Sequence, residues 1–144
     1  MTPELGRLAK WLRAVGYDAA VFTGDIPDLL AKATGEHRVI LTRRCALRSH
    51  RGTPVVWIKD DQLPKQLRAV PRACRIGPFQ KNLFTRCLLC NVAVKQIAKA
   101  KMKEKVPPYV YQTQKAFSYC PSCRRIYWAA THWYRASKFL KGID

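Results

Sequence analysis

Cys87-Leu-Leu-Cys90 and Cys120-Pro-Ser-Cys123 are two short cysteine motifs separated by 29 residues. Each pair can form a tight turn that presents two thiolates to one side of a metal ion, and two such turns complete a tetrahedral zinc site. Two disulfides or redox-active dithiols are the alternative. The N-terminus shows no secretory h-region, and disulfides within a Cys-x-x-Cys pair would link only neighbouring residues and so stabilise the fold little. The spacing therefore predicts a zinc ribbon whose ligands are Cys87, Cys90, Cys120 and Cys123.

Four protein thiolates leave no open coordination position for a substrate or an activated water molecule. The zinc ion is therefore expected to be structural, holding together a segment whose apolar residues are too sparse for a conventional core. Cys45 and Cys74 lie outside both motifs and are expected to be ordinary buried thiols. Any chemistry must reside elsewhere in the chain.

The charge of the chain is strongly positive. Its 144 residues contain 27 Lys and Arg against 9 Asp and Glu, a formal net charge of +18 and a pI near 10.2. Residues 1–76 carry 14 basic and 7 acidic residues, and residues 77–144 carry 13 and 2, so the excess is larger around the cysteines. Nucleic acid is the commonest polyanion to bind such a surface. A membrane is a weaker candidate because no apolar run approaches about 20 residues.

Apolar spacing before the cysteines alternates between strand and helix patterns. Leu5, Leu8, Leu12 and Val15 predict a helix that Gly16 ends. Arg7, Lys10 and Arg13 fall away from this stripe, as either a phosphate-facing edge or a solvated face. Further strands are expected at 19–22, 39–42 and 54–58, and further helices at 25–34 and 63–70. This alternation predicts an α/β fold with a small parallel sheet covered by helices.

A linker is expected where Pro71, Gly77 and Pro78 interrupt the apolar periodicity. It divides the chain into an α/β domain of residues 1–76 and a zinc ribbon module of residues 77–144. The module is expected to contain a basic insert and a short C-terminal helix from about His132 to Leu140.

Basic residues gather in three places that favour contact with RNA phosphates, although lysine runs are often only solvated faces. The densest run has five lysines in eleven positions between the cysteine pairs. Six aromatic residues nearby either stack on unpaired bases or form the small core of the ribbon, with one or two expected to be exposed: Tyr109, Tyr111, Tyr127, Trp128, Trp133 and Tyr134. The predicted RNA contacts are Arg43, Arg44, Arg48, Arg51, Lys95, Lys99, Lys101, Lys103, Lys105, Arg124 and Arg125.

Several segments together resemble one known family. They are Leu5-Gly-Arg-Leu-Ala-Lys-Trp-Leu-Arg-Ala-Val-Gly-Tyr-Asp18, Arg38-Val-Ile-Leu-Thr-Arg43, Val106-Pro-Pro-Tyr-Val-Tyr111, Ile126-Tyr-Trp128 and Thr131-His-Trp133. They resemble the Mut-seven C-terminal RNase domain family, a PIN-like nuclease fold with an appended zinc ribbon. The resemblance covers nearly the whole chain and implies that residues 1–76 form a PIN-like domain.

PIN-like nucleases are expected to cluster carboxylates at the carboxyl ends of parallel strands, where Mg or Mn ions orient water. The family's first acid lies on a strand just before the Leu-Gly-Arg-Leu helix, and that strand is expected to be missing before Met1-Thr2-Pro3. Where the family continues Leu41-Thr42-Arg43 with an aspartate, this chain has Arg44. A guanidinium repels a metal ion that an aspartate would bind.

Four other acids fall where the family carries acids. Asp25 and Asp28 also suit a helix N-cap and a first-turn position, and Asp60 and Asp61 also suit a helix start. The capping interpretation is preferred for Asp25 and Asp28.

The sequence favours a non-catalytic RNA-binding protein derived from a PIN-like RNase, with structural zinc and no catalytic metal. Its expected partners are rRNA or another structured RNA and other subunits of a ribonucleoprotein such as a ribosome, in a reducing intracellular compartment, either cytoplasm or organelle matrix. The alternative is a metal-dependent endoribonuclease that uses Asp25, Asp28 and Asp60 or Asp61 with Mg or Mn. A protein-binding adaptor is a third hypothesis, which the net charge disfavours.

Overall fold

The first helix forms as its apolar spacing predicts. The computed structural model describes residues 1–76, 83–129 and 131–142, and begins with a 3-10 turn, η1 (Pro3–Leu5), that continues into α1 (Gly6–Ala14). Leu5, Leu8 and Leu12 are at most 3% exposed, because their spacing places them on one face of the helix. The chain leaves the helix at Gly16, whose φ of 92° is accessible to glycine without strain.

The first sheet is small and parallel. Strand β1 (Ile40–Thr42) pairs in parallel with β2 (Val55–Trp57), with Ile40 opposite Val55. The turn η2 (Cys45–Leu47) lies in the connection between them. Both strands fall within the segments predicted from apolar runs, which confirms the parallel α/β layer.

Two extended residues continue this layer beyond β1. Thr2 donates its backbone N–H to the Leu41 carbonyl at 3.2 Å, while the Met1 nitrogen donates to the Ala20 carbonyl at 2.8 Å. Phe22 donates back to the Met1 carbonyl at 2.9 Å. The sequence predicted that the first strand is missing and that 19–22 is a strand. The prediction of a strand at 19–22 is wrong, because this segment pairs with Met1 through two hydrogen bonds and forms no regular strand. No strand is assigned to Met1 and Thr2 either, although they lie between 20–22 and β1.

Helices α2 (Ile26–Gly35) and α3 (Leu63–Cys74) follow the predicted positions. Asp25 caps α2 by accepting a hydrogen bond from the Asp28 backbone N–H at 2.9 Å. Pro71 lies inside α3, so the helix continues past the residue at which the linker was predicted to begin. The other two linker residues, Gly77 and Pro78, lie outside the described residues.

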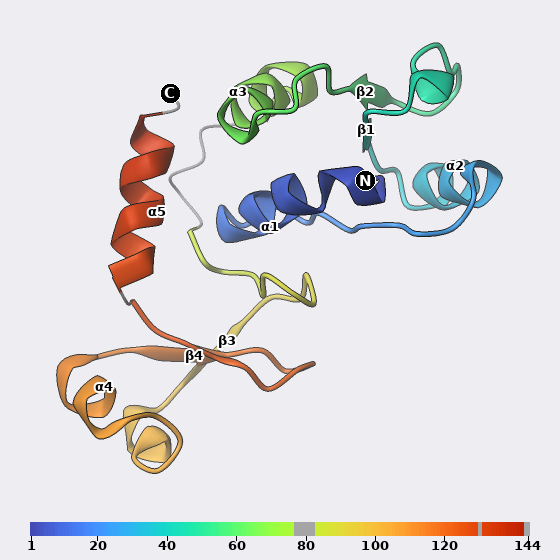
Figure 1. Ribbon diagram of the computed structural model, residues 1–144. Helices are drawn as coiled ribbons and strands as arrows, with labels where there is room; N and C mark the ends of the chain where they lie inside the picture. Colours follow the sequence, from blue (N-terminus) through green and yellow to red (C-terminus); the bar gives the residue numbers. More distant parts are fainter. Residues whose placement is uncertain (77–82, 130, 143–144) are drawn as a thin grey trace.

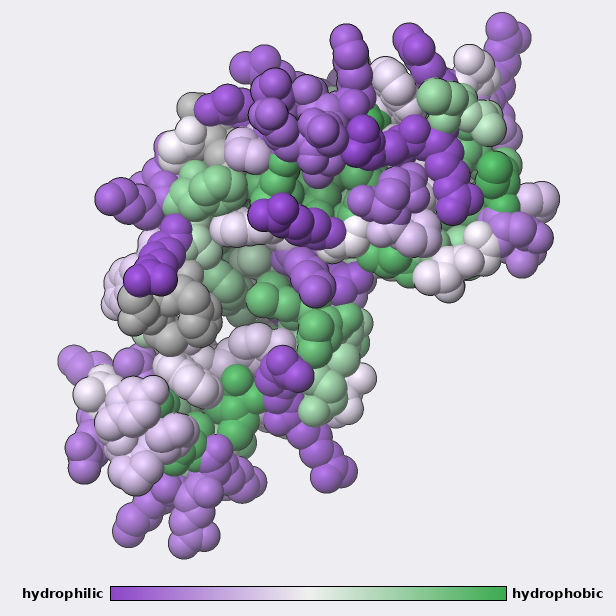
Figure 2. Space-filling view, in the orientation of Figure 1, coloured by the Kyte–Doolittle hydropathy of each residue, from purple (hydrophilic) through white to green (hydrophobic). Residues whose placement is uncertain are grey.

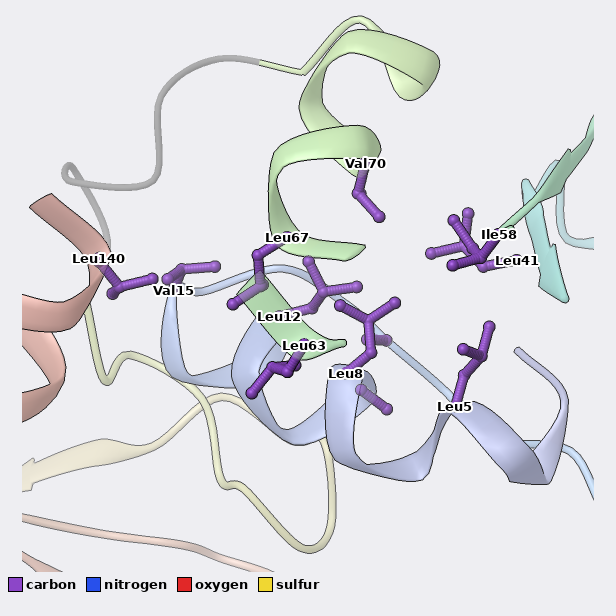
Figure 3. Close-up of a cluster of buried hydrophobic side chains, with 12 residues drawn as sticks. Leu5, Leu8, Leu12, Val15, Leu41, Ile58, Leu63, Leu67, Val70 and Leu140 are labelled. Atoms are coloured by element: carbon purple, nitrogen blue, oxygen red, sulfur yellow. The ribbon is translucent and has the colours of Figure 1, made fainter. Parts of the chain in front are cut away.

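The main hydrophobic core joins segments from both ends of the chain. It is built from α1, α3 and the strands, and it includes Leu140 of the last helix, α5 (Thr131–Lys141). Figure 3 shows Leu140 next to Val15 at the end of α1, in line with Leu12 and Leu67. The C-terminal helix was predicted from about His132 to Leu140, and α5 confirms it.

The segment with the cysteines has its own antiparallel sheet in the order β3-β4-β5, formed by β3 (Lys95–Ile97), β4 (Phe117–Tyr119) and β5 (Ile126–Tyr127). Between β3 and β4 lie the turn η3 (Lys99–Met102) and helix α4 (Pro108–Thr113). A second core forms here from Met102, Val106, Val110 and Phe117. In Figure 1, α5 extends from this part of the molecule to lie alongside the first part.

Hydrophilic side chains cover both parts of the molecule, and apolar surface is visible where the two parts meet (Figure 2). In the described residues, no helix has the length and apolar character needed to cross a membrane.

Candidate metal centre and basic surfaces

The first cysteine pair lies on a tight hydrogen-bonded turn. Cys87 donates its backbone N–H to the Val92 carbonyl at 2.8 Å, and its own carbonyl accepts from the Asn91 N–H at 3.0 Å. Asn91 has a φ of 62°, a left-handed conformation that asparagine tolerates better than most residues. The Cys90 N–H also points at the Cys87 sulfur, at 3.3 Å. The turn therefore aims both sulfurs to the same side.

The second pair repeats this pattern. Cys120 donates to the Arg125 carbonyl at 2.9 Å, and its carbonyl accepts from the Arg124 N–H at 2.9 Å. Arg124 takes the left-handed position, with a φ of 59°. The Cys123 N–H lies 3.5 Å from the Cys120 sulfur. This second turn connects β4 to β5 and has the same hydrogen bonds as the first.

The four sulfurs are close enough to share one metal ion. All four lie within 4.8 Å of one another, and the Cys87 and Cys123 sulfurs are 3.8 Å apart. A tetrahedral zinc ion with Zn–S bonds of about 2.3 Å requires sulfurs about 3.8 Å apart. The residues thus fit a closed tetrathiolate site for zinc.

The electrostatics of the cluster favour a bound cation. Burial raises the pKa of Cys87, but hydrogen bonds from Tyr127 and from the amides of Cys90 and Leu89 outweigh it and lower that pKa to about 6. The neighbouring Cys123 and other thiols raise the pKa of Cys90 to about 11. Cys87 therefore loses its proton readily, and the ionisation of Cys90 is disfavoured beside the other thiols. A divalent cation among the four sulfurs would offset this repulsion between negative charges.

All six cysteines are free thiols, including the two outside the cluster. Cys45 is exposed, which contradicts the prediction that it is buried, because the turn η2 turns its side chain outward and buries Leu47 instead. Cys74 is half-buried against the main core, and this burial raises its pKa.

Arg13 connects the first cysteine turn to helix α1. Its guanidinium donates to the carbonyls of Leu88 and Leu89, at 2.8 and 2.9 Å, and to the Ala19 carbonyl at 2.8 Å. The side chain is only 7% exposed. The sequence suggested that Arg13 faces either phosphates or solvent. Both interpretations are wrong for this residue, because the first cysteine turn covers it.

Asn91 makes a second connection between the two parts of the chain. Its side-chain oxygen accepts from the Ala19 N–H at 3.0 Å, and its amide nitrogen donates to Asp18 at 2.6 Å. Asp18 in turn accepts two hydrogen bonds from Arg38, which is the main reason that its pKa lies below the ordinary carboxyl value. The first cysteine turn is thus docked through polar contacts on both sides.

Glu4 occupies the carboxyl end of β1. Its carboxylate accepts from the Thr2 hydroxyl and from the Arg43 N–H, the latter at 3.2 Å, and pairs with Arg44 at 3.8 Å. Burial raises its pKa, but these contacts more than compensate and hold it below the ordinary value. Along the chain, Glu4 belongs to the turn η1 that leads into α1. Thr2 pairs with Leu41, which no local sequence pattern reveals, and this pairing places Glu4 at the carboxyl end of β1.

Of the four candidate acids, Asp25 and Asp60 make local side-chain contacts. Asp25 caps α2 and Asp28 is exposed in its first turn. The Asp60 carboxylate lies 4.0 Å from the Lys65 amine, and the carbonyls of Asp60 and Asp61 accept from the Gln66 side chain. Within the described residues, the four cysteines form the one group of three or more Cys, His, Asp or Glu that could hold a metal ion.

The predicted RNA-contact residues belong to three segments of the chain. Those after β1 are all exposed, and the Arg48 guanidinium lies 4.7 Å from the centroid of the Trp57 ring. Of the insert lysines, Lys99 is half-buried with its amine 5.0 Å from the Tyr111 ring, and the others are exposed. Arg124 and Arg125 are exposed on the second cysteine turn. Their contact with RNA stays a prediction.

Two of the six aromatic residues singled out from the sequence are well exposed, namely Tyr109 at 69% and Tyr134 at 63%. The others are half-buried, and Tyr111 and Trp128 pack against the second core.

A parallel α/β layer, an antiparallel sheet with a four-cysteine cluster and a C-terminal helix together agree with one family. The model of the Mut7-C RNAse domain matches residues 1–140. The chain belongs to the Mut7-C RNase domain family. No curated protein and no solved structure shows significant similarity to it. Membership in the Mut7-C family points to a nuclease and to RNA as the class of substrate.

Proposed function

We propose that this Mut7-C domain binds RNA without cleaving it, through a basic surface held in shape by a structural zinc ion. The observation that carries the proposal is the ion pair between Arg44 and Glu4 at the carboxyl end of β1. PIN-like nucleases are expected to hold their metal-binding acids at this edge. Here the Arg44 guanidinium lies beside the Glu4 carboxylate, and its positive charge opposes the binding of a divalent cation at this edge.

The contacts of the other acids support the same proposal. Asp25 is used as a helix cap, and Asp60 pairs with Lys65. A two-metal or one-metal hydrolytic site requires several carboxylate oxygens that converge on the ion. Among the described residues, no three Asp or Glu side chains bring their carboxylate oxygens close enough together to hold one ion.

The charge supports RNA as the partner. The exposed basic residues after β1, in the insert and on the second cysteine turn belong to a chain of net charge +18. Phosphate contacts of this kind give affinity that depends steeply on salt. A stable ribonucleoprotein such as a ribosome, in a compartment that keeps thiols reduced, is the setting that we favour, with rRNA or another structured RNA as the partner.

Family membership favours a second function, a metal-dependent endoribonuclease. In this alternative Asp25, Asp28 and Asp60 or Asp61 bind Mg or Mn. Glu4 also lies at the strand edge and adds a further carboxylate.

Cleavage assays separate the two functions. Purified protein is incubated with structured and single-stranded RNA in Mg or Mn, beside the double variant Asp25→Asn, Asp28→Asn. Asparagine caps helices about as well as aspartate, so the variant should remain folded. We expect binding without metal-dependent cleavage by either protein. Cleavage that this variant abolishes would overturn the proposal and establish the nuclease.

Neutralising the insert lysines is expected to weaken RNA binding about ten-fold or more and to lower the salt dependence. The test variant changes the exposed Lys95, Lys101, Lys103 and Lys105 to Gln, and spares Lys99 because it packs on Tyr111. Affinity is measured by fluorescence anisotropy at several salt concentrations.

The matched control changes four exposed lysines elsewhere to Gln, namely Lys32, Lys59, Lys65 and Lys141. Both variants lose the same charge. An equal loss of affinity in the two would mean that the insert is not an RNA-binding surface.

A further inference from the structure

A cavity of about 440 Å³ lies between α1, α5 and the first cysteine turn. Its volume falls within the range of small-molecule binding sites. Its walls are mostly apolar or aromatic, and they come from three elements distant in sequence. The described lining includes Lys10, Trp11, Phe84, Leu88, Arg135 and Phe139.

Aromatic rings form two of its walls. Trp11 of α1 and Phe139 of α5 have ring centroids 4.8 Å apart. Phe84 enters from the loop before the first cysteine turn, and its ring centroid is 6.1 Å from that of Trp133. Rings arranged around an open space offer planar surfaces on which a further flat ring can stack.

The backbone of Phe84 is held in an unusual conformation beside the cavity. Its φ is 57°, which is rare for a bulky residue, and its N–H donates to the Ala14 carbonyl at the end of α1 at 2.6 Å. Backbone strain of this kind persists where the surrounding structure enforces it, and it often occurs at binding sites.

The charged groups of the cavity are all cationic among the described lining residues. Lys10 and Arg135 are exposed on facing helices, and neither has an ion-pair partner within the described part of the chain. Arg7 precedes Lys10 by three residues and Lys138 follows Arg135 by three, so each helix carries a second cation near the same face. A ligand with a flat apolar ring and negative groups beside it matches this arrangement.

We propose that this cavity binds an unpaired base of single-stranded RNA, with the adjoining phosphates held by Lys10 and Arg135. This rests on the proposed RNA binding and assigns it a specific pocket. The base stacks against the rings of Trp11, Phe84 and Phe139 in place of water. Because any base has a stacking face, the pocket tolerates different sequences.

The test compares two fluorescent probes of equal length and charge by anisotropy: a six-nucleotide oligoadenylate and an abasic ribose-phosphate chain. The native chain is expected to bind the oligoadenylate at least about five-fold more tightly, because one stacked base contributes that much or more. The variant Ala136→Leu narrows the cavity without changing charge. It should abolish this preference and leave binding of the abasic chain unchanged.

A second variant, Lys10→Gln with Arg135→Gln, alters only exposed side chains and should weaken binding of both probes. Its matched control is Lys32→Gln with Lys141→Gln. Thermal melting and zinc content verify that each variant is folded.

The outcomes separate this inference from the proposed function. If the native chain binds neither probe nor longer RNA, the proposed function fails. If it binds RNA without preferring bases, or if Ala136→Leu keeps the preference, the pocket is overturned while RNA binding stands. The pocket also fails if the Lys10 and Arg135 variant loses no more affinity than its control.

Discussion

Replacing Cys120 with serine is expected to abolish stoichiometric zinc binding, to unfold the β3–β5 module and to destabilise the α/β layer to which it is docked. Cys120 is fully buried, and its backbone closes the second cysteine turn. A serine hydroxyl does not ionise at neutral pH and is a poor zinc ligand, and structural zinc contributes about 10–16 kcal/mol in small zinc-finger peptides. The free energy lost with the zinc ion should therefore exceed the stabilisation that the four buried residues of this module can provide.

Zinc content per chain, measured by elemental analysis, and thermal unfolding followed by circular dichroism check this prediction. Cys45→Ser is the matched control, because Cys45 is exposed and lies outside the cluster. It should keep one zinc ion and an unchanged melting temperature. A Cys120→Ser protein that still holds one zinc ion, or that melts like the native protein, would contradict the metal assignment.

Replacing Arg13 with methionine is expected to lower the free energy of unfolding by about 3 kcal/mol, because three carbonyls lose their donor. Methionine preserves the length and much of the volume of the side chain, so the effect reports chiefly on the hydrogen bonds. Arg13→Lys should recover only part of the loss, since an ammonium lacks the planar fork that reaches carbonyls on two segments.

Denaturant unfolding gives the free energies, and competition with a zinc chelator gives the stability of the metal site. Arg7→Met is the control on the same helix, because Arg7 is exposed and should change stability by less than about 0.5 kcal/mol. Arg13→Met should also release zinc faster, since the first cysteine turn loses its support. Equal stabilities for the Arg13 and Arg7 variants would mean that the contact contributes nothing.

Local patterns in the sequence predicted those parts of the fold that depend on neighbouring residues. The Leu5, Leu8 and Leu12 stripe places α1, and Asp25 marks the start of α2 by a cap that acts over three residues. The cysteine ligands were predictable for the same reason, since each Cys-x-x-Cys pair is a complete local turn. Pro71 led to a wrong helix end because α3 continues to Cys74, although the proline nitrogen cannot donate the hydrogen bond that another residue would make at this position.

Contacts between distant segments could not be predicted in this way. Arg13 was assigned to the surface of α1 because its partners, Leu88 and Leu89, lie 75 and 76 residues away. Glu4 reaches the edge of β1 only because Thr2 pairs with Leu41. The cavity between α1 and α5 is likewise formed by segments at opposite ends of the chain.

Asn91 has a double role that links the four-cysteine cluster to the rest of the molecule. Its left-handed backbone closes the first cysteine turn, while its side chain binds Ala19 and Asp18. Asn91 thus belongs both to the first cysteine turn and to the contact with the α/β layer, and we expect each of these to stabilise the other. The α/β layer and the ribbon should therefore unfold in a single cooperative transition, whose midpoint depends on zinc concentration even when it is followed by a probe in α1.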